Sequence, residues 1–475
     1  MFKRESRGLK TIAFSGCFCA YALIWLGSSR NAAFGQGTWI SNLFDNAGQP
    51  LYLTPLIEKG QLDMAKSSSR VGSLGFVENL PSYSGFLTVN PNLGSNIFFW
   101  FFPAMENPET APVVLWLQGG PGSSSLFGLF VEHGPYSVSK QGVPQLRQVT
   151  WARRYSMLYV DNPVGVGFSF TQQDQGYARN ETDVGRDLLE ALQQFFTLFP
   201  EYVGNDFYAT GESYAGKYVP AIAHAIDTAV QPRVSINLKG IAIGNGFVDP
   251  VTMIDYGSYL YGIGLVDRQQ AAVIQQKTDT AISLINQGRY AEANEEIGPV
   301  LGGNPSIYEN YTGFTFYYNY LLVKEPADQE YYAPFLQTTR VRKAIHVGTI
   351  PFSDFNSTVY DKLNADQMVS VKPWFTALLE KYKVLLYSGQ MDVIIPYPFT
   401  ENFLASLNWS GASAFANVPR QVWRTPDGGD VYGYVRQLDN LTEVMVRNGG
   451  HILAYDQPAA AFDMITKFID DKPFA

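Results

Sequence analysis

The amino-acid sequence predicts an α/β fold with a mostly parallel central sheet and helices on both faces. Short apolar runs that end in glycine or polar residues are typical of strands buried in such a sheet. The chain contains six of them: "APVVLWLQGG", "YSMLYVDNP", "NDFYATGES", "LKGIAIGNG", "YKVLLYSGQMD" and "TEVMVRNGGH". Helical patterns lie between several runs, as in "ETDVGRDLLEALQQFFTLFP" and "KYVPAIAHAIDTAV". The alternation of strands and helices indicates right-handed crossovers and a parallel sheet.

Residues 1–35 have the features of a secretory signal peptide. Four basic residues between positions 3 and 10 precede the apolar run "TIAFSGCFCAYALIWLG", and small residues follow it. We expect cleavage near residue 35 and no stable membrane insertion afterwards. The alternative is an uncleaved membrane anchor. The run is close to the lower length limit for a membrane span and contains Ser15 and Gly16, which favours the signal peptide.

The positions of the cysteines and of the glycosylation sequons also favour the secretory pathway. Both cysteines, Cys17 and Cys19, lie inside the signal segment, so the mature chain would have no disulfide. Several Asn-x-Ser/Thr sequons behind a signal peptide indicate a glycoprotein of the secretory pathway, either secreted or lysosomal/vacuolar. The five sequons are at Asn180, Asn310, Asn356, Asn408 and Asn440.

The remaining chain divides into an N-terminal segment and one α/β domain. Residues 36–71 are turn-rich and polar, and we interpret them as a loose extension or a pro-segment. The domain, residues 72–475, begins with "SGFLTVN" and "NIFFWFFPA", which predict a hairpin at the sheet edge. Between "IAIGNG" and "VLLYSG" the alternation stops, and a helical run and the aromatic "FTFYYNYLLV" follow. We expect a mostly helical cap inserted at about residues 250–345.

The composition excludes several classes of function. With 475 residues, 46% hydrophobic and 16% charged, the chain can bury a large core and does not resemble a disordered protein. A formal net charge of −9 provides no basic field for phosphate, so we expect no nucleic-acid partner. The sequence shows no phosphate loop, nucleotide motif or metal-ligand spacing, so we expect no metal and no cofactor.

Polar residues after the predicted strands form a candidate catalytic site. Ligands of open α/β sheets bind outside the carboxyl ends of the strands. Ser213, Asp392 and His451 all lie there, in this order. Because this is the order of the catalytic triad in α/β hydrolases, we predict an α/β-hydrolase fold. Ser213 would attack a carbonyl carbon, His451 would accept its proton, and Asp392 would fix the imidazole tautomer.

The surroundings of Ser213 support this assignment. A serine in a glycine-flanked turn is usually structural when taken alone, so the ordered partners carry the argument. The turn "GESYAG" resembles the nucleophile elbow G-x-S-x-G, with Ala215 at the last small position and Gly216 after it. For the oxyanion we expect the amide of Tyr214 and a second donor from "GGPG", around Gly120.

The other three histidines have different interpretations. His224 lies in a helical stretch and His346 in "RKAIHVG", so we interpret both as packing or surface residues. His133, in "EHGP", is interpreted as a loop residue that could lie near the site.

Six segments resemble the serine carboxypeptidases, peptidase family S10. They are "VVLWLQGGPGSSSLFGLFVEHGPYSV", "YVDNPVGVGFSF", "ATGESYAGKYVPAIA", "GIAIGNG", "YSGQMDVIIPY" and "RNGGHILAYDQP". The resemblance runs from about residue 72 to the C-terminus and is nearest to the vitellogenic-like carboxypeptidases. It implies an enzyme that releases C-terminal residues from peptides or proteins through an acyl-enzyme.

The resemblance also implies how the free carboxylate of the substrate is bound. In this family a glutamate before the nucleophile pairs with a second glutamate; these are Glu212 and Glu132 here, with Gln118, Gly119 and Trp116 nearby. Two close carboxyls in a desolvated site share a proton, because at least one pKa rises. A protonated carboxyl can donate a hydrogen bond to a carboxylate, so we expect activity to be favoured at acid pH.

The chain departs from many relatives at two positions and leaves other functions open. Gln118 stands where asparagine is common, and Ser123 where cysteine is common. The alternatives are an acyltransferase on the same scaffold, a non-catalytic partner that stabilises other enzymes, and a lipase or esterase. The paired glutamates would have no role in a lipase. The sequence predicts no particular oligomeric state.

Overall fold

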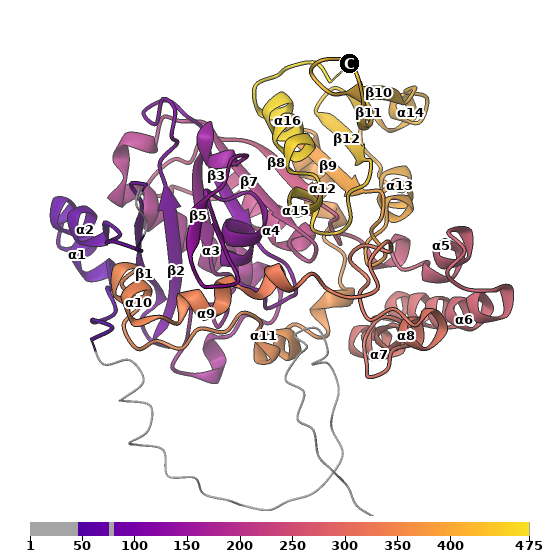
Figure 1. The fold of residues 1–475 in the computed structure, drawn as a ribbon, viewed down its shortest axis with the longest axis horizontal. Helices are drawn as coiled ribbons and strands as arrows, with labels where there is room; N and C mark the ends of the chain where they lie inside the picture. The colour runs from indigo at the N-terminus through magenta and orange to yellow at the C-terminus, as the bar shows by residue number, and fades with distance from the viewer. Residues whose placement is uncertain (1–45, 76–79, 475) are drawn as a thin grey trace, which may run out of the picture.

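The computed structural model describes residues 46–75 and 80–474, and the predicted signal peptide lies outside them. A ten-stranded sheet has the order β1-β2-β6-β3-β7-β8-β9-β12-β11-β10, and a small separate hairpin pairs β4 with β5 (Figure 1). The strands are β1 (Tyr83–Asn90), β2 (Ser95–Phe102), β3 (Val113–Leu117), β4 (Tyr136–Val138), β5 (Pro144–Leu146), β6 (Ser156–Val160), β7 (Phe207–Glu212), β8 (Leu238–Gly244), β9 (Lys383–Gly389), β10 (Gln421–Arg424), β11 (Val431–Leu438) and β12 (Leu441–Val446).

The centre of the sheet is parallel and its two edges are antiparallel. Strands β6, β3, β7, β8, β9 and β12 pair in parallel, and they are the six apolar runs of the sequence. The predicted hairpin is β1 with β2, which extends antiparallel from β6. Strands β10 and β11 form a second antiparallel edge that the sequence pattern did not indicate. Most of their residues are half-buried or exposed, with single buried positions such as Trp423 and Val435, so they lack the continuous apolar signal of the central strands.

Helices cover both faces of this sheet, as the fold class predicts. The α-helices of the described residues, including those that lie beside the sheet, are α1 (Thr54–Glu58), α2 (Leu62–Ser69), α3 (Glu181–Leu198), α4 (Ala215–Asp227), α5 (Tyr256–Gly262), α6 (Arg268–Asn286), α7 (Tyr290–Ile297), α8 (Ile307–Thr312), α9 (Tyr332–Leu336), α10 (Thr339–Ala344), α11 (Ser357–Lys362), α12 (Lys372–Leu379), α13 (Tyr397–Ala405), α14 (Ala412–Phe415), α15 (Leu453–Asp456) and α16 (Pro458–Ile469).

Strand β3 shows how the alternation of side chains builds two cores. Val113, Leu115 and Leu117 pack into the cluster that contains the apolar residues of α3 and α4. Val114 and Trp116 point to the opposite face and pack with apolar residues of α9, α10 and α16. Because successive side chains of a strand point to opposite faces, a continuous apolar run requires cover on both sides.

The N-terminal segment is packed against the sheet edge where the structure describes it. The amide of Leu53 donates to the carbonyl of Phe86 at 2.9 Å, and the amide of Phe86 donates to the carbonyl of Leu51 at 2.9 Å. Leu53 is fully buried, and α1 and α2 follow it. The expectation of a loose extension is therefore wrong for residues 46–71, because apolar side chains anchor this part to β1.

The chain between β8 and β9 forms helices α5 to α12 and no strand. Figure 1 shows α5 to α8 as a helical group beside the sheet, while α9 and α10 run back along the sheet toward β1 and β2. The amide of Gly72 donates to the carbonyl of Ala344 at 3.0 Å, which ties the end of α10 to the N-terminal segment. The division of the chain at residues 35, 71 and about 250–345 stays a prediction.

Candidate active site

Ser213 lies in a sharp turn between β7 and α4. Its φ of 63° is in the left-handed region, which a non-glycine residue adopts only under local constraint. The amide of Ser213 donates to the carbonyl of Gly244 at 3.0 Å. Its carbonyl accepts from the amides of Gly216 and Phe247, both at 2.9 Å. These bonds fix the strained backbone at the carboxyl ends of β7 and β8.

Close backbone approaches explain the small residues of this turn. A Cβ on Gly211 would lie 2.5 Å from the carbonyl oxygen of Leu117 and 2.7 Å from Cβ of Ala215. A Cβ on Gly216 would lie 2.6 Å from the amide nitrogen of Phe247. Ala215 itself is fully buried at the start of α4, so an alanine fits where the motif usually has glycine.

Asp392 and His451 form a buried pair at the same end of the sheet. Nδ1 of His451 lies 2.8 Å from Oδ2 of Asp392, and both side chains are at most 2% exposed. Oδ1 of Asp392 accepts from the amides of Ile394 at 2.9 Å and Ile395 at 3.2 Å. Since the carboxylate is held by amide donors, it can in turn hold Nδ1 of the imidazole. Nε2 of His451 has no hydrogen-bond partner among the described residues.

Asn245, which the sequence analysis did not single out, connects the three strand ends. Its side-chain amide donates to the carbonyls of Gly450 at 3.1 Å and His451 at 2.6 Å. Its side-chain oxygen accepts from the amide of Gly389 at 2.7 Å. Asn245 directly follows Gly244, which accepts the Ser213 amide, so the loops of Ser213, Asp392 and His451 meet around one buried side chain.

The predicted oxyanion segment lies beside the nucleophile. A Cβ on Gly119 would lie 2.5 Å from the amide nitrogen of Tyr214 and 2.8 Å from Cβ of Ser213. Gly120 has a φ of 114°, which favours glycine. The backbone of "GGPG" can therefore approach the amide of Tyr214 and the reacting carbonyl together.

Asp161, at the end of β6, holds the loop after this segment. Its Oδ1 accepts from the hydroxyl of Ser124 at 2.6 Å and the amide of Ser125 at 3.2 Å, and its Oδ2 accepts from the amide of Phe168 at 2.9 Å. Burial raises the pKa of Asp161 to about 7. A Cβ on Gly167 would lie 2.0 Å from Oδ2, so the loop closes tightly around the carboxyl group.

The two glutamates are buried next to each other, and a chain of hydrogen bonds reaches Glu212. The indole of Trp116 donates to Oε1 of Gln118 at 3.0 Å, and Nε2 of Gln118 donates to Oε1 of Glu212 at 2.7 Å. The side chain of Gln118, which is longer than an asparagine side chain, therefore reaches Glu212 directly. Both oxygens of Glu132 and Oε2 of Glu212 have no hydrogen-bond partner among the described residues.

The environment favours the protonated form of both carboxyls. Burial raises the pKa of Glu132 to about 8, although the side chains of Glu212 and Gln118 and the charge of Arg147 act in the opposite direction. Burial and the neighbouring charge of Glu132 raise the pKa of Glu212 well above its ordinary value. Both directions agree with the expectation that the pair holds at least one proton at neutral pH.

Glu132 is presented by a π-helical turn, η1 (Gly128–Glu132), and π-turns are frequent at functional sites. A Cβ on Gly128 would lie 2.2 Å from Nε1 of Trp116, so the glycine lets the turn pack onto the indole. His133 follows and stacks on Trp151 with centroids 4.1 Å apart. Burial lowers the pKa of His133 well below its ordinary value, so the imidazole is a neutral packing residue here.

A buried ionic cluster behind the elbow also escaped the sequence analysis. Nζ of Lys217 is fully buried, donates to the carbonyl of Asp366 and lies 3.6 Å from its Oδ2. The hydroxyl of Tyr214 donates to the same carboxylate at 3.4 Å. Burial raises the pKa of nearby Glu181 well above its ordinary value. A lysine in a helix gives no sequence signal of burial, because its partners lie far away in the chain, in α3 and in the turn Asp366–Met368.

The predicted sequons differ in accessibility. The side chains of Asn180, Asn310 and Asn408 are exposed. Those of Asn356 and Asn440 are half-buried, and their amide nitrogens donate to main-chain carbonyls at 2.7 Å and 3.0 Å. The first three side chains are thus open to solvent.

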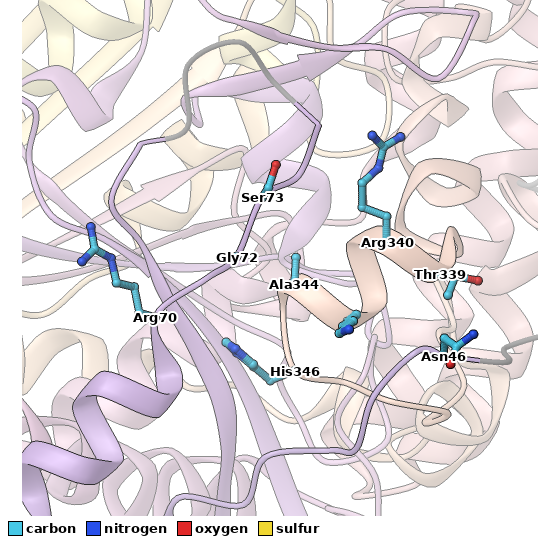
Figure 2. A pocket seen from close by; sticks show the side chains of 9 residues that line it. Asn46, Arg70, Gly72, Ser73, Thr339, Arg340, Ala344 and His346 are labelled. Carbon is cyan, nitrogen blue, oxygen red and sulfur yellow. The ribbon is translucent and has the colours of Figure 1, made fainter.

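A surface pocket is lined by residues other than the predicted site residues. It opens between the N-terminal segment and α10 and is lined by the basic side chains of Arg70, Arg340, Lys343 and His346 (Figure 2). Figure 2 shows the side chain of Arg70 extending away from the other labelled residues, so its guanidinium and that of Arg340 do not converge on one point. Among the described residues no group of three or more histidine, cysteine or acidic side chains is placed to hold a metal ion. No helix in the described part is long and apolar enough for a membrane span.

The sheet order, the strained elbow and the strand-end residues define an α/β hydrolase. The fold resembles that of Kex1Δp, a prohormone-processing carboxypeptidase from Saccharomyces cerevisiae, with a TM-score of 0.76 and 24% identity, covering 86% of this chain and 96% of that one. The chain belongs to the serine carboxypeptidase family, whose model matches residues 74–471.

Curated relatives agree with this family. The chain is 49% identical to the venom serine carboxypeptidase of Apis mellifera over 436 residues, which cover 90% of this chain and 93% of the relative. It is 50% identical to the probable serine carboxypeptidase CPVL of Homo sapiens over 435 residues (90% and 91%). It is 41% identical to the vitellogenic carboxypeptidase of Aedes aegypti over 466 residues (97% and 98%). It is thus a serine-type carboxypeptidase, a hydrolase that acts on peptide bonds.

Proposed function

We propose that this carboxypeptidase uses Ser213, His451 and Asp392 as its catalytic triad and the Glu132–Glu212 pair to bind the free carboxylate of the substrate. The observation that carries the proposal is the buried pair Glu132 and Glu212, on which three carboxyl oxygens have no hydrogen-bond donor among the described residues. Glu212 directly precedes the nucleophile in the chain. A buried polar group without a partner is costly and indicates a missing ligand. A protonated pair of carboxyls is suited to bind a carboxylate.

The residues divide the reaction into two steps. Oγ of Ser213 attacks the scissile carbonyl carbon while Nε2 of His451 takes its proton, and the amides around Gly120 and Tyr214 stabilise the oxyanion. His451 then gives the proton to the leaving nitrogen, which releases the C-terminal residue and leaves an acyl-enzyme. Water repeats the sequence and regenerates Ser213. Asp392 keeps Nδ1 of His451 protonated throughout, so that Nε2 is the acceptor.

The same arrangement supports an acid-shifted activity. The substrate carboxylate is ionised across the working range, so it requires donors, and the glutamates are donors only while they hold a proton. As pH rises past about 8, Glu132 loses its proton and repels the substrate. His451 must be unprotonated to act as base, so binding and acylation have opposite pH requirements. The resulting kcat/KM profile has its maximum below the pH at which the glutamates lose their protons.

The test compares a blocked dipeptide that has a free C-terminus with its C-terminal amide, between about pH 4 and about pH 8. Ser213→Ala is the control for the nucleophile. We expect hydrolysis of the free acid only, strongest at acid pH and abolished in Ser213→Ala. Equal cleavage of acid and amide would contradict the carboxylate site. If an alcohol acceptor captured the acyl group in preference to water, the chain would be an acyltransferase.

We further propose passage through the secretory pathway and glycans on the exposed sequons Asn180, Asn310 and Asn408. The signal-like residues 1–35 and the relative named as a venom protein support this route. Expression in a secreting eukaryotic cell with endoglycosidase treatment tests it. A single unchanged band, retained in the cell, would contradict the proposal.

A further inference from the structure

A short stretch of the helical insertion lies between the Asp392 loop and the His451 loop; we name residues 317–320 the strap. The amide of Val393 donates to the carbonyl of Tyr317 at 3.2 Å, and the amide of Tyr320 donates to the carbonyl of Met391 at 3.0 Å. These two bonds flank Asp392 on both sides. The strap is thus joined to the loop that carries the carboxylate of the acid–base pair.

The strap is bound to the His451 loop as well. The amide of His451 donates to the carbonyl of Tyr318 at 2.6 Å. The side chain of Asn319 donates to Oδ2 of Asp456 at 3.0 Å, and the same oxygen accepts from the amide of Gly450 at 2.7 Å. A Cβ on Gly450 would lie only 2.3 Å from the carbonyl oxygen of Tyr318. Only a glycine beside His451 allows this close approach.

The ring of Tyr318 stacks on the imidazole of His451. The ring centroids are 4.8 Å apart, and the planes are inclined by 30°. The hydrogen bond between Nδ1 and Asp392 fixes one atom of the imidazole but still allows the ring to turn about that contact. A ring packed on one face removes this freedom. The hydrogen bond and the stack together leave one orientation of Nε2.

We propose that Tyr318 is a positioning residue, which holds the His451 imidazole in the orientation required for proton transfer and so makes the insertion part of the acid–base site. The inference rests on the proposed role of His451 as the base. The proposal gives the aromatic stretch "FTFYYNYLLV" a function in addition to forming part of the cap. The reason is that the strap is hydrogen-bonded to both the Asp392 loop and the His451 loop.

The contact also has an electrostatic consequence. The π-face of an aromatic ring stabilises a cation that lies over it, so Tyr318 favours the imidazolium that forms during acylation. The other charged or titratable groups around His451 are the carboxylates of Asp392 and Asp456 and the hydroxyl of Tyr259, which donates to the Asp392 carbonyl at 2.8 Å. Loss of the aromatic ring would remove the stacking contribution to His451 and leave these three groups in place.

The experiment compares Tyr318→Leu with Tyr318→Phe in the full secreted enzyme. Phe314→Leu is the matched control, since Phe314 also lies in the insertion and packs against Tyr308 with centroids 6.4 Å apart, without contact to the pair. We expect Tyr318→Leu to lower kcat about three- to tenfold at unchanged KM and to move the acid limb of kcat/KM to lower pH. Tyr318→Phe and Phe314→Leu should keep the wild-type values.

A second readout does not depend on turnover. The Nδ1 proton of His451, bonded to Asp392, gives a downfield proton NMR signal, which should weaken or shift in Tyr318→Leu and persist in Tyr318→Phe. Equal kcat, equal acid limb and equal signal in both variants would overturn the inference. So would a loss of activity in both variants, since the phenyl ring retains the stack. If the wild type failed to hydrolyse peptides, the proposed function would fall, and the NMR comparison would still decide whether Tyr318 orients His451.

Discussion

Nδ1 of His451 lies 2.8 Å from Oδ2 of Asp392 although 59 residues separate them in the chain. Both side chains are buried, so the hydrogen bond is shielded from water. Two turn amides hold the carboxylate, and a carbonyl of the strap holds the histidine backbone. The pair therefore exists before substrate binds, as expected for a preorganised base.

Replacement of this carboxylate tests the pair directly. In Asp392→Asn the amide can donate to Nδ1, which stabilises the tautomer with a proton on Nε2. This tautomer cannot accept the Ser213 proton, so we expect kcat to fall by about 10⁴-fold with little change in KM. Steady-state kinetics check the result, and a circular-dichroism melt shows whether the variant folds. A loss of less than about tenfold would contradict the assignment of Asp392.

The proposed role of the glutamate pair predicts the alkaline side of the pH profile. Because the pKa of Glu132 is raised to about 8, the wild type should lose affinity for a free carboxylate near that pH. In the double variant Glu132→Gln and Glu212→Gln the amides donate at every pH, so the alkaline fall of kcat/KM should flatten. KM for the free-acid dipeptide, measured across the range, provides the test. An unchanged alkaline limb in the double variant would refute the role of the pair.

Gly119 has no room for a side chain beside the nucleophile. In Gly119→Ala the new Cβ would lie 2.5 Å from the Tyr214 amide nitrogen, so the backbone must move away from the oxyanion position. We expect kcat to fall by about 10²-fold or more. Gly204→Ala is the control, because a Cβ there meets nothing within 4 Å and the backbone is not left-handed. Similar kinetics of the two alanine variants would exclude Gly119 from the oxyanion segment.

Buried carboxyls should make the fold less stable as pH rises above neutrality. Burial raises the pKa of Asp161 and of Asp354 to about 7, and that of Glu132 to about 8. The folded state thus binds more protons than the unfolded state, and the stability present at low pH is lost as pH rises through these values. His133 and His346, with lowered pKa values, oppose this only below about pH 6.5.

We therefore expect Tm to fall between about pH 6.5 and about pH 8, with up to about 1.4 kcal/mol of unfolding free energy per pH unit for each group. Thermal melts at constant ionic strength measure the slope. Glu132→Gln should reduce the slope, because this variant loses one of the protonated carboxyls. A Tm that rises across this window would contradict the buried, protonated state of these groups.

Much of the candidate site could be predicted from the sequence because its signals are local. The apolar runs that form β3, β7, β9 and β12 end where the candidate site residues begin. Because these runs are apolar without alternation, they indicate strands that are buried on both faces. Gly211 and Ala215 around Ser213 identify the elbow without any long-range contact. The two antiparallel strands β10 and β11 have no such pattern, since they lie at the sheet edge and are half exposed.

The residues that orient the site depend on contacts between distant parts of the chain. In the sequence Asn245 is one polar residue in a glycine-containing turn. The structure shows that its side chain bonds the backbone of Gly389 and of His451. The sequence pattern gives no sign that the helical Lys217 is buried, and the structure places it against Asp366. The sequence by itself determined which apolar runs form the central strands and which polar residues follow them, because hydrophobic pattern and turn chemistry are local. Only the tertiary structure decided that Tyr318 stacks on His451, because that contact spans 133 positions (451 minus 318) and arises from packing.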